Sequence, residues 1–130
     1  MNWNYLHKIL YLLVLTCSVV SSAQTTITSV VSQSSDDAEQ RISNGSTSTN
    51  SSDLELTSDG SNNQLVGIRF QNINIPQGTT IISASIQFTV DETNSGATSV
   101  TIRGQDINNA PTFNTSNNNI SNRTLTTASV

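Results

Sequence analysis

Most of the side chains in this sequence that could do chemistry are carboxylates. Nine Asp and Glu residues occur along the 130-residue chain, whereas the single histidine and the single cysteine lie near its start. Oxygen ligands of this kind suit Ca²⁺, which accepts carboxylates, amides and carbonyls in variable geometry. The hypothesis is a structural Ca²⁺ held by some of a clustered set, namely Asp36, Asp37, Glu39 and Asp106. The alternative is that these are solvated loop acids, since no EF-hand spacing is present.

Catalysis by a Ser-His-Asp or Cys-His arrangement needs an imidazole or a comparable base beside the nucleophile. Beyond residue 23 the sequence contains no His, Lys or Cys, which excludes those mechanisms and typical zinc sites from that part. Two carboxylates can still cleave a glycosidic bond, so a carboxylate-dependent glycan hydrolase or lyase is a third candidate function. We expect the protein not to be an enzyme.

Aromatic side chains, which often form the stacking platforms of sugar sites, are scarce. Beyond residue 23 they are Phe70, Phe88 and Phe113. Phe70 and Phe88 fall on the apolar faces of expected strands, which favours core packing. Phe113 follows Pro111 in a polar loop and is the candidate for a ligand contact. The alternative for Phe113 is a plug over the end of the domain.

The charge balance argues against a nucleic-acid partner. Residues 24–130 carry four arginines against nine carboxylates, a net charge of −5, and no lysine. Nucleic-acid binding depends on clustered Lys and Arg that neutralise phosphates. We therefore expect no nucleic acid among the partners.

The start of the chain has the pattern of a secretory signal peptide. A basic start at Lys8 is followed by the apolar run 9–20 and by the small residues 21–23, with cleavage expected after Ala23. The run is shorter than the roughly 20 residues of a membrane-spanning helix. We therefore predict a helical signal peptide at 1–23, a domain at 24–130, a secreted or cell-surface location and no membrane span. A retained anchor and a lipid attached at Cys17 are the alternatives.

The clearest element that could position these side chains is a strand at 82–90. Ile82, Ala84, Ile86, Phe88 and Val90 alternate with Ser, Gln and Thr, so one face is apolar and the other polar. Turn signals lie at 59–62, 76–78 and 91–96, and polar loops are expected at 36–52 and 105–122. The remaining strands are expected at 24–35, 53–57, 64–70, 98–104 and 124–130.

These elements predict an all-β domain, because no stretch beyond the signal peptide has a 3.6-residue apolar period. We expect an antiparallel β-sandwich of jelly-roll type. The chain stops within a strand-like run at Val130, so we expect the sandwich to be incomplete at its C-terminal end.

Several motifs together resemble a known family. They are Ser35-Asp36-Asp37-Ala38-Glu39, Ser52-Asp53-Leu54-Glu55-Leu56, Val66-Gly67-Ile68-Arg69-Phe70, Ile75-Pro76-x-Gly78 with the strand to Val90-Asp91-Glu92, and Thr101-Ile102-Arg103-Gly104, in that order. The set resembles the N-terminal part of secreted bacterial jelly-roll modules related to disaggregatase-type (DNRLRE-like) carbohydrate-binding domains.

The resemblance implies an accessory extracellular module, with a glycan or other extracellular domains of a longer chain as partners. We therefore expect a non-catalytic module that binds a polysaccharide or cell-surface glycan. The alternative is a structural spacer or adhesin-like domain without a ligand.

Overall fold

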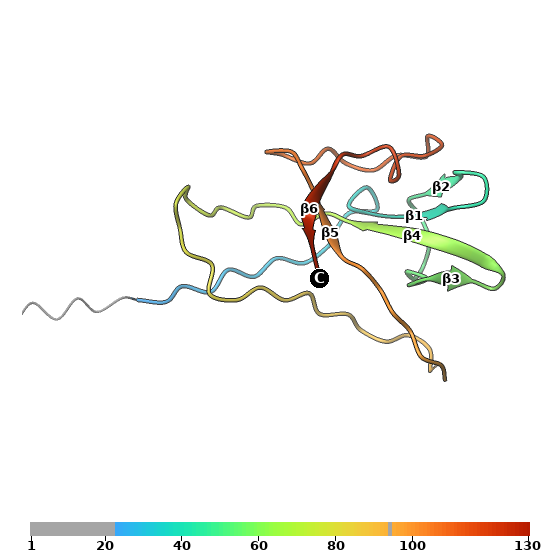
Figure 1. The fold of residues 1–130 in the computed structure, drawn as a ribbon, viewed down its shortest axis with the longest axis horizontal. Coiled ribbons are helices and arrows are strands. Elements are labelled where there is room, and N and C mark those ends of the chain that lie inside the picture. Colours follow the sequence, from blue (N-terminus) through green and yellow to red (C-terminus); the bar gives the residue numbers. More distant parts are fainter. Residues whose placement is uncertain (1–22, 94) are drawn as a thin grey trace, which may run out of the picture.

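The computed structural model describes residues 23–93 and 95–130. Within them the chain forms antiparallel strands in two sheets and no helix, so the predicted all-β class is confirmed (Figure 1). The expected signal peptide lies outside the described residues except for Ala23. Across the described ranges, no helix is long and apolar enough to cross a membrane.

The larger sheet has four strands in the order β2-β1-β4-β3. Its strands are β1 (Asp37–Arg41), β2 (Thr47–Ser48), β3 (Ser58–Asp59) and β4 (Asn62–Ile68). The central pair is β1 and β4, with Glu39 opposite Val66 and Arg41 opposite Gln64. Because directly opposed residues share a face, Ala38, Gln40 and Gly67 lie on the other face.

Two tight turns build this sheet. The β1–β2 turn places Gly45 at φ 74°, and the Gly45 amide donates to the Arg41 carbonyl at 2.8 Å. The β3–β4 hairpin passes through Gly60 at φ 57°, in the left-handed region that glycine adopts without steric strain. The predicted hairpin turn at 59–62 is thus confirmed.

The strand positions differ from the prediction in the first half of the sheet. The loop predicted over 36–52 is wrong at β1 and β2, and the strand predicted at 53–57 lies instead at 58–59. The strand predicted at 64–70 is shifted to 62–68. The hydrophobic pattern did not predict β1, because the buried face of this strand carries Gln40. The Gln40 amide makes hydrogen bonds instead of apolar contacts.

The smaller sheet consists of β5 (Arg103–Gln105) and β6 (Leu125–Ser129). An irregularity in register separates the Arg103–Ser129 pair from the Gln105–Leu125 pair. Ile102 and Val130 extend the pairing through two backbone hydrogen bonds of 2.7 and 3.1 Å. The last predicted strand, 124–130, is confirmed closely, and the one at 98–104 begins later than predicted.

Two predicted strands are not formed. Residues 24–35 and 82–90 form no strand pairing, and residues 33–35 instead form a turn that the Asp36 amide closes on the Gln33 carbonyl at 2.8 Å. Residues 82–90 are part of the long arm in Figure 1. Ile82 is 73% exposed and Val90 is 76% exposed, whereas Ile86 and Phe88 are 40% and 41% exposed, so the apolar face predicted for 82–90 is only partly covered among the described residues. The turn predicted at 76–78 is confirmed, with Gly78 at φ 83° and a 3.2 Å bond from the Thr79 amide to the Pro76 carbonyl.

The core lies between one face of the larger sheet and the loop that joins β5 to β6. Its most buried apolar residues are Ala38 and Phe113, and the polar residues buried with them include Gln40 and Thr47. In Figure 1 the loop runs beside the larger sheet, above β1 and β2. The jelly-roll sandwich itself stays a prediction.

Candidate functional site

The candidate site is the Asn-rich loop at residues 106–124, which is fixed to the larger sheet by backbone hydrogen bonds. The Phe113 amide donates to the Ser35 carbonyl at 2.8 Å, and the Asn118 amide donates to the Gly45 carbonyl at 2.7 Å. The predicted polar loop is therefore confirmed, but it is attached along its length and does not project freely from the sheet.

One buried amide makes the central attachment. Gln40 is 2% exposed, and its Oε1 accepts from the backbone amides of Ile120 at 2.9 Å and Ser121 at 3.0 Å. Its Nε2 donates to Ser121 Oγ at 2.9 Å. A buried amide oxygen and nitrogen are thus both satisfied, which the interior requires of polar groups. The sequence analysis missed Gln40, because no apolar spacing marks a residue that packs through hydrogen bonds.

Phe113 packs directly on the backbone of β4. Its side chain is 7% exposed, and a Cβ added to Gly67 would lie 2.5 Å from Phe113 Cζ and 3.3 Å from Ile120 Cδ1. Gly67 therefore leaves the space that the ring fills. Phe113, the residue predicted as a candidate ligand contact, is buried against the sheet and does not offer a face to solvent.

Arg123 covers the other side of the Phe113 ring. Its guanidinium carbon lies 4.0 Å from the ring centroid, a distance suited to a cation–π contact. The side chain also donates to the carbonyls of Pro111, Thr112 and Asn119, each at 2.9 Å. Burial, with a smaller effect of the positive charge of Arg69, lowers the pKa of Arg123 below its ordinary value. Arg123 thus links residues 111–112 to residue 119 of the loop around one ring, a role that the sequence did not indicate.

The amide side chains of the loop divide into two groups. Asn114 and Asn119 bond each other, with Asn119 Nδ2 donating to Asn114 Oδ1 at 3.1 Å, and the Asn114 oxygen also accepts from the Ser116 amide at 2.9 Å. These contacts shape the loop. Asn117 and Asn122 are exposed on the same loop and present their amides to solvent. An amide side chain offers two donors and an acceptor.

The first predicted calcium ligand, Asp36, forms an ion pair. Asp36 is 1% exposed, and its Oδ1 accepts from Arg69 Nη1 at 2.5 Å, while its Oδ2 accepts from Gln71 Nε2. The Gln71 hydrogen bond, aided by Arg69 and opposed by burial, lowers the pKa of Asp36 from 3.8. Arg69 also donates to the Ala110 carbonyl at 2.7 Å, which ties β4 to the start of the loop.

Arg69 directly follows the last residue of β4. In the strand predicted at 64–70, alternation would place the Arg69 side chain on the polar face. The side chain is instead 19% exposed and pairs with Asp36, which precedes β1. The register of two paired strands decides which residues meet just beyond their ends. Alternation within one strand does not predict these contacts.

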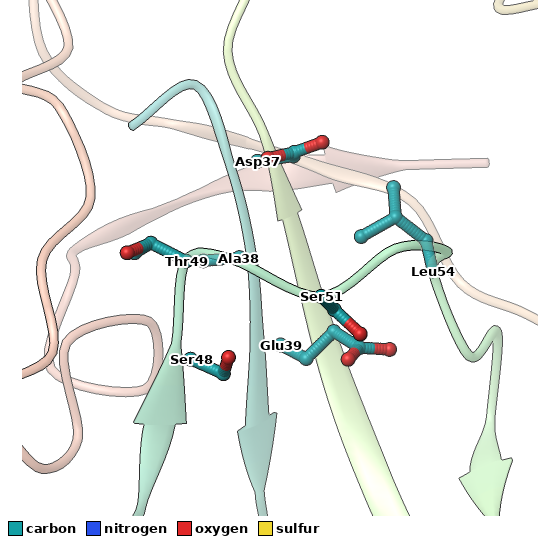
Figure 2. Close-up of a pocket in the computed structure, with 7 residues that line it drawn as sticks. All are labelled: Asp37, Ala38, Glu39, Ser48, Thr49, Ser51 and Leu54. Atoms are coloured by element: carbon teal, nitrogen blue, oxygen red, sulfur yellow. The ribbon is translucent and has the colours of Figure 1, made fainter. Parts of the chain in front are cut away.

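The other predicted calcium ligands lie in two places. Asp37 and Glu39 line a shallow surface depression beside Ser48, Ser51 and Leu54 (Figure 2). Glu39 Oε1 accepts from the Glu55 backbone amide at 2.5 Å and so fixes the segment before β3. Asp106 is exposed at the end of β5.

The four acids are not brought together. In the part of the chain that the structure describes, no three His, Cys, Asp or Glu side chains gather in a way that could hold a metal ion. The calcium site stays a prediction. A calorimetric titration with Ca²⁺ tests it, and an absence of both binding heat and any change in melting temperature would contradict it.

Glu55 lies close to further acids at the same edge of the sheet. Burial, followed by the charges of Asp53, Asp59 and Glu39, raises the pKa of Glu55 from 4.5. Asp59 is itself held by Arg41 at 3.3 Å in an exposed ion pair. The negative charges of these neighbours thus disfavour the ionised form of Glu55.

Comparisons of the chain with protein-family models, with curated proteins and with solved structures find no match.

Proposed function

We propose that this protein is a non-catalytic extracellular accessory module whose Asn-rich loop, residues 106–124, binds a polysaccharide or cell-surface glycan. The observation that carries the proposal is the exposure of Asn117 and Asn122 on a loop that Gln40 and Arg123 hold in place. Amide donors and acceptors complement sugar hydroxyls. A loop that is already ordered loses less conformational entropy when a ligand binds.

The extracellular and accessory parts of the proposal have separate support. The pattern of residues 1–23 is typical of a secretory signal peptide. The resemblance to disaggregatase-type carbohydrate-binding modules supports a jelly-roll sandwich that acts beside other domains of a longer chain. The absence of His, Lys and Cys beyond residue 23 supports a non-catalytic role.

A second candidate function is that of a structural spacer without a ligand. The observation that favours it is the position of Phe113, since Arg123 and β4 enclose the ring that would otherwise serve as a stacking platform. Sugar binding without aromatic stacking has to rely on hydrogen bonds, which contribute little net free energy each in water.

Binding of the full chain to a panel of immobilised bacterial and plant polysaccharides distinguishes the two functions. For a glycan-binding loop, Asn117→Ala and Asn122→Ala weaken binding by about tenfold or more, whereas the matched control Asn74→Ala, exposed in another part of the chain, leaves it unchanged. Failure of the unmodified protein to bind any polysaccharide would favour the spacer. Equal losses in all three variants would place the ligand elsewhere.

A further inference from the structure

The segment 81–90 carries exposed apolar side chains and has no strand partner among the described residues. Ile82, Ile86, Phe88 and Val90 are between 40% and 76% exposed. Within the described part of the chain, the backbone groups of 81–90 form no backbone–backbone hydrogen bonds. An extended segment with a free backbone and one apolar face is a template for pairing with another strand.

The residues of this segment are self-complementary about Ile86. In an antiparallel pair of two copies centred there, Ile82 lies opposite Val90, Ala84 opposite Phe88, and Ile86 opposite itself. The small side chain of Ala84 thus faces the large ring of Phe88, and two β-branched residues face each other at each end. Aromatic and β-branched cross-strand pairs stabilise a sheet relative to alanine pairs.

The polar face has the same symmetry. Ser83 lies opposite Thr89, and Ser85 lies opposite Gln87, so each side chain faces one with which it can form a hydrogen bond. In this one register, both faces of the segment therefore complement the same faces of a second copy. A twofold interface requires this, because residue i of one copy contacts residue j of the other, and residue j of the first contacts residue i of the second.

The charges select the antiparallel arrangement. Residues 70–90 contain no Asp, Glu, Lys or Arg, and Asp91 and Glu92 follow directly. In a parallel, in-register stack, each of these acids would lie beside its own copy, which is unfavourable. In the antiparallel pair, Asp91 and Glu92 of one copy lie opposite Ile81 and Thr80 of the other, so the acids of the two copies are far apart.

We propose that residues 82–90 are a homodimerisation strand, which pairs antiparallel with the same residues of a second copy of this chain about an axis at Ile86. The interface goes beyond the proposed glycan-binding function and involves none of the loop residues 106–124. It gives the segment a backbone partner and covers those parts of its apolar side chains that are exposed in the single chain.

Disulfide cross-linking tests the register. In the full chain carrying Cys17→Ser, an introduced cysteine is the only thiol. Opposed strand residues have the Cα separation that a disulfide needs. An oxidised mixture of the Ile82→Cys and Val90→Cys proteins gives a linked dimer, and each protein alone gives about tenfold less. Efficient linking of each protein alone would instead indicate a parallel stack, and no linking in the mixture would overturn the proposal.

Sedimentation analysis tests the same interface without oxidation. Ile86→Lys places two ammonium groups directly opposite each other and weakens dimerisation by at least about tenfold. The matched control Gln87→Lys adds the same charge on the polar face, opposite Ser85, and changes dimerisation by less than about threefold. An unmodified protein that remains monomeric at every concentration, or equal effects of the two substitutions, would overturn the proposal. Both positions are exposed, so neither change disturbs the buried core.

Discussion

The larger sheet buries polar side chains, whereas the segment 82–90 exposes apolar ones. The sheet and its flanks bury Asp36, Gln40 and Thr47, all polar, whereas the segment exposes Ile82 and Val90. Asp36 and Gln40 can be buried because partners for their hydrogen bonds come from distant parts of the chain, such as Arg69 for Asp36, whereas Thr47 bonds the nearby Gly45 carbonyl. The apolar residues of the segment remain exposed because no second strand lies beside them in the described chain.

This contrast shows which kind of information an alternating pattern contains. Alternation states which side chains would share a face if a strand formed. Formation of the strand depends on a neighbour that supplies backbone hydrogen bonds, and that neighbour is set by non-local pairing. The segment with the strongest alternation, 82–90, therefore lies outside the sheets. A segment with weak alternation, 37–41, forms the central strand β1.

Phenylalanine provides the sharpest comparison of the two regions. Phe113→Ala removes a buried ring from Gly67 and Arg123 and is expected to lower the free energy of unfolding by about 3–5 kcal/mol. In the monomer, the matched substitution Phe88→Ala removes a ring that is 41% exposed and is expected to change it by less than about 1 kcal/mol. Urea unfolding of both variants, at a protein concentration too low for dimerisation, measures the difference. Similar losses would show that the Phe88 ring is packed within the single chain as well as the Phe113 ring.

Glutamine gives a second matched pair. Gln40→Leu leaves the amides of Ile120 and Ser121 without their acceptor and is expected to lower the free energy of unfolding by about 1–3 kcal/mol. Gln87→Leu, on the exposed segment, is expected to stay within about 0.5 kcal/mol of the unmodified protein. Thermal unfolding provides the measurement, and a neutral Gln40→Leu would contradict the assigned attachment of the loop.

Arginine gives a smaller effect that depends on geometry. Arg123→Lys keeps the charge but loses the planar group that bonds three carbonyls and stacks on Phe113, with an expected loss of about 1–2 kcal/mol. Arg103→Lys, at an exposed position of β5, is the control and is expected to be neutral within about 0.5 kcal/mol. Chemical unfolding of the two variants checks the difference, and equal stabilities would remove the special role of Arg123.

The smallest expected effect is on the pH dependence of stability. The pKa of Asp36 is lowered in the folded chain, so its stabilising contribution is complete above the ordinary value of 3.8 and is lost as pH falls through the lower folded value. The raised pKa of Glu55 acts in the opposite sense, because that contribution is complete below 4.5 and is lost as pH rises through the raised value.

Melting temperatures measured between about pH 2 and pH 7 separate these two contributions. Asp36→Asn is expected to reduce the loss of stability on acidification, and Glu55→Gln is expected to reduce the loss on raising the pH. The same pH profile for both variants and the unmodified protein would contradict the assigned contacts of Asp36 and the acidic surroundings of Glu55.

The sequence determined a part of this molecule correctly. The all-β class, the turns at 59–62 and 76–78, the Asn-rich loop and the strand near 124–130 are all encoded by local preferences of Gly, Pro, Asn and β-branched residues. Composition beyond residue 23 also limited the chemistry, since side chains that are absent cannot take part in a site.

The tertiary structure alone decided which of these elements form pairs and which side chains meet. The Asp36–Arg69 pair, the Gln40 bonds to residues 120–121 and the fit of Phe113 to Gly67 join residues between 33 and 81 positions apart. No local pattern specifies such contacts, because they depend on strand register and on the path of the loop. For the same reason the sequence marked 82–90 as a strand but could not supply its partner.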